Sequence, residues 1–193
     1  RDGIRNIGQL QKMDERDLVQ RYDSIGLRLS RLSRGEDNRK IVPQSVAKSI
    51  SSETTFSEDL IAGAALEKHL WALAESTAER CKAKNVAGTT IVLKLKTSSF
   101  TTLTRNRSVN DPTQLADTIF SIGQTLLARV LNEKPGTKFR LIGIGVSGLV
   151  DAVHADPPDL ADPDKGRRKA AEQAMDNLRN KFGRGAIKKG RSL

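Results

Sequence analysis

Basic side chains that recur at every second position are the residues of this sequence best suited to bind an anion. Lys94 and Lys96 alternate with apolar residues, and Arg105 and Arg107 follow with the same spacing. In an extended strand, residues two apart lie about 6.5 to 7 Å from each other, and neighbouring strands lie about 4.8 Å apart. Such cationic groups form a lattice that can bind a row of phosphates. Contacts to phosphates do not depend on which base is present. The pattern predicts salt-sensitive binding of a polyanion without sequence preference.

The sequence offers no set of side chains for covalent catalysis or for a structural metal. Cys81 is the only cysteine, and His69 and His154 are the only histidines, so a structural zinc site is excluded. Residues 51–53, Ser-Ser-Glu, have no histidine partner that would activate a serine. The basic neighbours of Cys81 would lower the pKa of its thiol, whereas burial would make it an inert structural thiol, and both interpretations stay open. We expect no catalytic residue and no metal ligand.

The net charge of +10 is concentrated at the C-terminal end. Residues 164–193 carry ten basic and three acidic side chains, whereas residues 151–163 contain four aspartates and no lysine or arginine. This balance favours binding to a polyanion, with an ordinary solvated surface as the alternative. No run of 18 apolar residues could span a bilayer, and residues 1–30 are too charged for a signal peptide. We expect a cytoplasmic protein that binds no membrane and, since it starts with arginine, a fragment of a longer chain.

Alternating and helical patterns fill residues 45–150. The segment 89–97 alternates strictly, with Ile91, Leu93 and Leu95 on its apolar face, and therefore predicts a half-buried strand. Ser57, followed by two acids, and Asp111, followed by a proline, are typical of helix starts. The expected elements are strands over 46–55, 89–97, 101–108 and 138–147, and helices over 57–84 and from 111 onward.

The order strand, helix, strand, strand, helix, strand predicts an α+β, ferredoxin-like split βαβ fold. In this fold a four-stranded antiparallel sheet is covered by two helices on one face, so the other face stays open. A short helical hairpin over residues 9–32 is expected before this domain, and an amphipathic helix over residues 164–182 after it. The expected occupants of the open face are the hydroxyls of residues 49–55 together with Lys94, Lys96, Arg105, Arg107 and Arg140.

Residues 47–56, AKSISSETTF, resemble the first strand of the C-terminal DNA-gripping domain of Y-family DNA polymerases. The approach to this strand fits the same family, with Arg34-Gly35, Asp37 and Arg39 ahead of Val42 and Pro43. The resemblance is to bacterial translesion polymerases of the DNA polymerase IV type, and it covers essentially the whole chain. It implies a remnant of the helix-hairpin-helix thumb at 1–34, a linker at 35–44, a little finger at 45–150, an acidic segment at 151–163 and a basic helical tail at 164–193.

The resemblance implies that the chain binds duplex or primer-template DNA without sequence preference, as a monomer, for DNA synthesis past damage by a parent enzyme. The alternative is a protein-interaction module that docks a sliding clamp or another replication protein. By position in the family motifs, the resemblance assigns DNA contacts to Lys48, Ser49, Ser52, Thr54, Arg105, Arg107, Arg140, Gly145 and Ser147, with Gly143 in the same final strand; the alternating pattern adds Lys94 and Lys96.

Two departures from the family pattern limit what this chain is expected to do. The catalytic palm, whose acidic residues would hold two Mg²⁺ ions in the parent enzyme, is absent from these residues, so no polymerase activity is expected from the chain alone. The position of a clamp-binding peptide is degenerate, since only Asp159 and Leu160 fit it and Ala161 replaces the aromatic anchor. We expect clamp docking here to be weak or lost.

Overall fold

The computed structural model describes residues 2–41, 46–61, 63–159, 162–183, 185–187, 189 and 190. The chain divides into two units, Arg1–Ser45 and Val46–Leu193, and each is described by itself. Within the described residues, no helix is both long enough and apolar enough to cross a membrane.

Residues 2–41 of the first unit form three short helices rather than the expected hairpin of two. Asn6 and Gln9 form a reciprocal capping box at the start of the first helix, and Asp14 caps the second. The second and third helices approach so closely that a Cβ on Gly26 would lie 1.9 Å from the backbone oxygen of Leu18, so only glycine fits there. The helices are α1 (Ile7–Gln11), α2 (Glu15–Tyr22) and α3 (Ser24–Ser33).

The second unit is built on a four-stranded antiparallel sheet in the order β1-β4-β2-β3. The last strand lies between the first two, so it splits the first βαβ unit, and the predicted fold class is confirmed. The outer strands β1 and β3 are edges, each paired on one side only. The strands are β1 (Ser49–Leu60), β2 (Val86–Thr97), β3 (Thr102–Thr113) and β4 (Phe139–Asp151).

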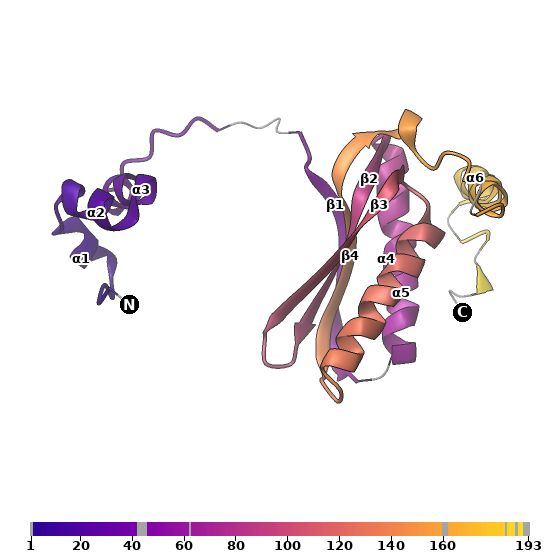
Figure 1. The fold of residues 1–193 in the computed structure, drawn as a ribbon, viewed down its shortest axis with the longest axis horizontal. Helices are drawn as coiled ribbons and strands as arrows, with labels where there is room; N and C mark the ends of the chain where they lie inside the picture. Colours follow the sequence, from indigo (N-terminus) through magenta and orange to yellow (C-terminus); the bar gives the residue numbers. More distant parts are fainter. Residues whose placement is uncertain are drawn as a thin grey trace. The chain divides into compact units, whose positions relative to one another are not determined.

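Helices α4 (Gly63–Ala83) and α5 (Ala116–Glu133) cover one face of this sheet, as Figure 1 shows. The core between the layers includes Leu70 and Trp71 of α4, which are almost fully buried. The predicted apolar face of β2 points into this core, since Ile91, Leu93 and Leu95 are each at most 1% exposed. Burial of these side chains is the main favourable contribution to folding.

Two predicted helix starts are wrong, because the strands continue through them. β1 extends past Ser57 to Leu60, and β3 extends past Asp111 and Pro112 to Thr113. Both are edge strands, where acidic side chains can face water and a proline without an N–H group is tolerated. The helices begin only at Gly63 and Ala116.

The predicted tail helix is confirmed as α6 (Lys165–Phe182), which follows the short 3-10 turn η1 (Ala152–His154). Helix α6 (Figure 1) is bonded to the rest of its unit, since its Glu172 accepts hydrogen bonds from Lys82 of α4 and from the backbone N–H of Ala116 of α5. The helix is therefore part of the same packed unit as the sheet.

Candidate nucleic-acid interface

The face of the sheet turned away from α4 and α5, here called the open face, follows from the strand register. Directly opposed residues share a face, and Ile91, Leu93 and Leu95 mark the helix-covered side, so their neighbours along β2 point the other way. The open face is formed by Ser49, Ser51, Glu53 and Thr55 of β1, Leu141, Gly143, Gly145 and Ser147 of β4, Thr90, Val92, Lys94 and Lys96 of β2, and Thr102, Thr104, Asn106 and Ser108 of β3.

Short hydroxyl side chains dominate the open face. Eight of its sixteen residues are serine or threonine, and two of them, Thr90 and Ser108, lie within hydrogen-bond distance of each other at 3.1 Å between oxygens. Hydroxyl groups can donate to phosphate oxygens, and such contacts do not read base identity. The surface therefore offers many neutral donors and few bulky side chains.

Two lysines are the only cations among these residues, and one of them is already paired. Lys94 Nζ lies 2.9 Å from Glu53 Oε2, and the two side chains reach each other from strands on either side of β4. The residue between them in the register is Gly143, which has no side chain to separate them. The ion pair thus bridges the centre of the open face.

Because Gly143 and Gly145 have no side chains, β4 can pack closely against the side chains of β1. A Cβ built on Gly145 would lie 2.5 Å from the Cβ of Ser51, and one on Gly143 would lie 2.8 Å from the Cβ of Glu53. Contacts this short do not occur between real side chains, so any larger residue would push the strands apart. Both glycines are themselves buried, so their role is to set the spacing between β1 and β4.

Three residues form a cationic cluster at one end of the sheet, here called the Phe100 cluster. Phe100 lies in the turn between β2 and β3 with a φ of 64° and is 61% exposed. Lys96 Nζ lies 5.2 Å, and Arg140 Cζ 4.1 Å, from the centroid of its ring. Arg140 is the extra residue of a bulge in β4, since Phe139 and Leu141 pair with consecutive residues of β2.

The structure corrects the face assigned to four predicted site residues. Ser52 donates to Ser76 of α4 across 3.1 Å, and Thr54 has the same orientation as Ser52 along β1. Arg105 is opposite Leu93 and Arg107 is opposite Ile91, so both arginines also lie on the helix-covered side. The four residues found on the helix-covered side instead of the open face are therefore Ser52, Thr54, Arg105 and Arg107.

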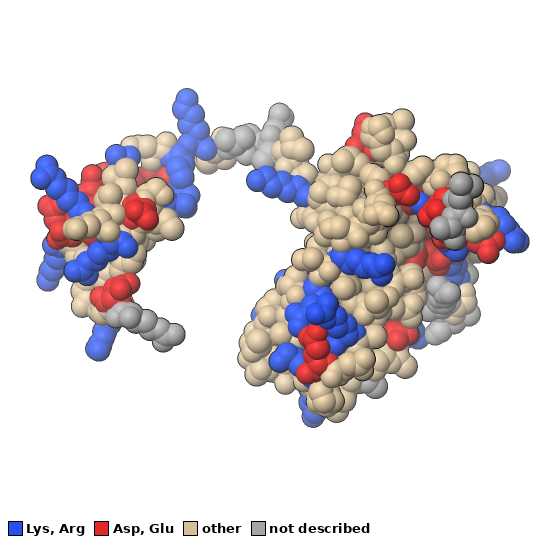
Figure 2. Space-filling model, in the orientation of Figure 1, with Lys and Arg blue, Asp and Glu red and all other residues tan. Residues whose placement is uncertain are grey.

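Arg105 of β3 reaches over the edge of the sheet toward α5. Arg105 forms an ion pair with Glu133, which also accepts a hydrogen bond from Arg129 at 2.8 Å. These bonds, from Arg105 first and then Arg129, hold the pKa of the Glu133 carboxyl below its ordinary value. In Figure 2, blue side chains gather around red ones over the region that β3 and α5 occupy in Figure 1.

A signal for this orientation is present in the sequence. Leu103 and Val109 have the same parity along β3 as Arg105 and Arg107, and both are partly buried against the core. On an edge strand, the aliphatic part of an arginine can pack over the rim of the helix layer while its guanidinium group stays in water. The apolar ends of the strand were therefore the better guide to its buried face.

The remaining predicted residues lie in four places. Ser49, Lys94, Lys96, Gly145 and Ser147 are on the open face, and Arg140 is in the Phe100 cluster. Lys48 is exposed immediately before β1. Of the predicted clamp-binding position, Asp159 is exposed, whereas Leu160 and Ala161 lie outside the described residues.

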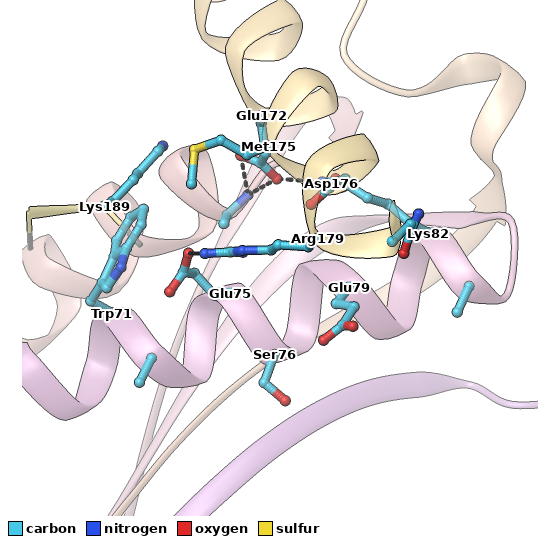
Figure 3. A pocket seen from close by; sticks show the side chains of 14 residues that line it. Trp71, Glu75, Ser76, Glu79, Lys82, Glu172, Met175, Asp176, Arg179 and Lys189 are labelled. Carbon is cyan, nitrogen blue, oxygen red and sulfur yellow. Dashed lines mark hydrogen bonds and ion pairs between the residues drawn. The ribbon is translucent and has the colours of Figure 1, made fainter. Parts of the chain in front are cut away.

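A cavity of about 580 Å³ between α4 and α6 is a second candidate site (Figure 3). Its charged groups are engaged with one another: Lys82 lies 2.6 Å from both Glu172 and Asp176, and Arg179 lies 3.0 Å from Glu75. Burial opposes the charged form of Lys82, but the two carboxylates outweigh it, so its pKa is raised above the ordinary value. The cavity is better described as a seam that holds α6 than as a ligand site.

Other reactive groups do not form a site within the described part of the chain. Cys81 is buried, and this burial raises the pKa of its thiol to about 11 despite the neighbouring Arg80 and Lys82. Between the two interpretations left open by the sequence, the inert structural thiol is the one that fits. No group of three His, Cys, Asp or Glu residues is arranged to hold a metal ion among the described residues.

Comparison with known proteins gives a consistent result. Residues 47–159 match the sequence profile of the impB/mucB/samB family C-terminal domain. The chain is 54% identical over 189 residues to DNA polymerase IV of Brucella melitensis and 53% identical over 190 residues to DNA polymerase IV 1 of Mesorhizobium japonicum. These alignments cover 98% of this chain but only 42% and 43% of the relatives, so the chain spans less than half of their length.

A solved structure shares the fold. A chain described as a Y-family DNA polymerase chimera of Dbh and Dpo4 superposes with a TM-score of 0.58 and 15% sequence identity, over 77% of this chain and 42% of the other. At this level of identity the likeness concerns the fold alone. The sheet with two helices on one face is thus an arrangement also found within a Y-family polymerase.

Proposed function

The chain belongs to the impB/mucB/samB family, whose C-terminal domain it matches, and from this we propose that it is the DNA-holding part of a translesion polymerase of the DNA polymerase IV type. In this proposal the open face lies along primer-template duplex DNA and contacts its backbone. The binding has no sequence preference, because the groups offered are hydroxyls and two lysines rather than side chains arranged to read bases. The domain keeps the duplex in place for a catalytic partner.

The observation that carries the proposal is the uncovered, small-side-chain surface of the sheet. Both helices lie on the opposite face, so no element of the second unit covers the hydroxyls of the open face within the described residues. Gly143 and Gly145 add no side chain at the centre of this surface, and Lys94 and Lys96 supply positive charge beside them. A phosphate backbone lying along the sheet could therefore meet these two lysines while the exposed hydroxyls of β1 and β3 donate to it.

The other parts of the chain have supporting roles in this proposal. We propose that residues 2–34, which form the three helices of the first unit, correspond to the end of the thumb that also contacts duplex DNA in such polymerases. Helix α6 is assigned a structural role, because its acidic residues are bonded to α4 and α5. We assign no catalytic role to any residue of this chain.

Duplex binding measured as a function of salt tests the proposal. A double variant, Lys94→Gln with Lys96→Gln, should bind a labelled primer-template duplex more weakly, and its slope of log affinity against log salt should be less steep by about one to two units. The matched control is Lys68→Gln with Lys134→Gln, which removes the same charge from exposed positions on α4 and at the end of α5. Equal slopes for the two double variants would contradict a grip by the open face.

A further inference from the structure

We infer that Glu53 is a built-in competitor of phosphate for Lys94 and sets how tightly the open face holds DNA. The inference rests on the proposed function, since it concerns the same surface. Glu53 is the only acidic residue of the open face, and its carboxylate lies against one of the two lysines. An acid at the centre of a polyanion-binding surface opposes binding and therefore calls for an explanation.

The pair is fixed by the register of three strands. Glu53, Gly143 and Lys94 are directly opposed across β1, β4 and β2, so the two side chains leave the sheet in one row. Glycine in the middle of that row is required, because a Cβ there would meet the Cβ of Glu53 at 2.8 Å. The backbone therefore presents Glu53 to Lys94 whether or not a ligand is present.

The pair is also accessible to a competing anion. The side chain of Lys94 is 43% exposed and that of Glu53 is 49% exposed, so solvent and phosphate oxygens can reach both. A pair this exposed shifts an equilibrium by only about 1.5- to fivefold, which is weak enough for a phosphodiester to displace the carboxylate. The displaced carboxylate then stays close to the phosphate and repels it.

The second lysine of the open face lies in a different setting. Lys96 is positioned over the ring of Phe100, and no carboxylate in the described part of the chain forms an ion pair with it. Its charge is therefore available to a phosphate without displacement of another anion. The two lysines, only two residues apart, should contribute unequally to DNA affinity.

A double-mutant cycle on the intact 193-residue chain tests the inference. The variants are Glu53→Gln, Lys94→Gln and the two combined, with Glu67→Gln as a control that removes one negative charge from the exposed surface of α4. The measurement is anisotropy of a fluorescent primer-template duplex between about 50 and 200 mM salt. A thermal melt of each variant verifies that the domain is folded.

Glu53→Gln should tighten duplex binding by about threefold or more and steepen the salt slope by about one unit, since Lys94 is then free to replace a counterion. In the Lys94→Gln background the same change should have a much smaller effect. An equal gain in both backgrounds, or a gain no larger than that of Glu67→Gln, would overturn the inference, because only net charge would then matter.

Failure of the proposed function has a different outcome. The single variant Lys96→Gln is therefore measured as well. If Lys96→Gln and Lys94→Gln both leave duplex affinity unchanged, the open face does not hold DNA, and the inference falls with the proposal. If Lys96→Gln weakens binding while Glu53→Gln has no effect, the proposed function stands and the inference alone is refuted.

Discussion

The guanidinium carbon of Arg140 lies 4.1 Å from the ring centroid of Phe100, directly over the aromatic face. Arg140 comes from the bulge in β4 and Phe100 from the turn between β2 and β3, so the contact joins two separate parts of the sheet end. Lys96 lies over the same ring at 5.2 Å. An exposed cation over an aromatic ring is stabilised by about 0.5 to 1 kcal/mol, which restricts both cations without neutralising them.

Phe100→Ala should therefore weaken duplex binding about two- to fivefold while leaving the salt slope unchanged, because no charge is lost and only the positioning of two cations is relaxed. The backbone cost of the positive φ stays the same, since alanine also has a Cβ. Anisotropy titrations at several salt concentrations measure both quantities.

Phe182→Ala is the matched control for this change. Phe182 is 63% exposed on α6 and has Lys181 over its ring, so it resembles Phe100 in exposure and chemistry but lies away from the sheet. It should leave duplex affinity unchanged. Equal effects of the two substitutions would show that the position of Phe100 has no special part in DNA binding.

Gly145→Ala should destabilise the domain by about 1 to 3 kcal/mol, because the added methyl group would lie 2.5 Å from the Cβ of Ser51 and force β1 away from β4. Urea denaturation, monitored by circular dichroism, measures the free energy of unfolding. In contrast, Gly166→Ala on α6 meets no atom within 4 Å and should be neutral or stabilising by up to about 1 kcal/mol. A neutral result at Gly145 would contradict the tight spacing of these strands.

Glu172→Ala should cost about 2 to 3 kcal/mol of unfolding free energy. Glu172 is 6% exposed, and its carboxylate accepts the backbone N–H of Ala116 at 3.0 Å and pairs with Lys82 at 2.6 Å. Its loss leaves the partly buried Lys82 with Asp176 as its one carboxylate partner among the described residues, and leaves the start of α5 uncapped. Asp164→Ala removes an exposed partner of Arg167 and should change stability by less than about 0.5 kcal/mol. Similar losses for both variants would argue against the role of Glu172.

The free energy of unfolding should fall at high pH, and ionisation of the Cys81 thiol should account for part of this loss. The unfolded thiol ionises near its ordinary pKa of 9.0, whereas burial raises the pKa in the folded protein to about 11. The unfolded chain therefore loses its proton first, and the contribution of this thiol, fully present below pH 9.0, is lost as the pH rises to about 11. Cys81→Ala should show a smaller loss of unfolding free energy over this range; an unchanged pH dependence would contradict the burial of the thiol.

Part of this architecture could be predicted from the sequence because the central strands carry strong patterns. The predicted segment 89–97 of β2 alternates without interruption and is buried on one face, so the side that it turns to the helices was predicted correctly. The edge strands carry weaker patterns, because each is paired on one side only and part of its helix-covered side is polar, as at Ser52 and Arg105. For that reason Arg105, which belongs to an edge strand, was predicted on the wrong face, and the two strands, predicted to end at residues 55 and 108, continue to Leu60 and Thr113.

The candidate site was predicted in part for the same reason. Lys94 and Lys96 lie on the patterned strand and are found on the open face as expected. The pairing of Lys94 with Glu53 was not predicted, because it depends on which strands are neighbours of β4, and strand order in the sheet is not encoded in local periodicity. A glycine directly between two opposite charges becomes informative only when the register is known.

The carboxylate of Glu172 has a practical consequence for where this domain ends. The conserved sequence profile stops at residue 159, yet the backbone N–H of Ala116 and the ammonium of Lys82 find their partner thirteen residues beyond that point, at residue 172. A protein truncated at residue 159 would contain every strand of the sheet but would expose the first turn of α5 to water. Its amide protons there should exchange faster, and the shortened chain should be the more readily digested by proteases.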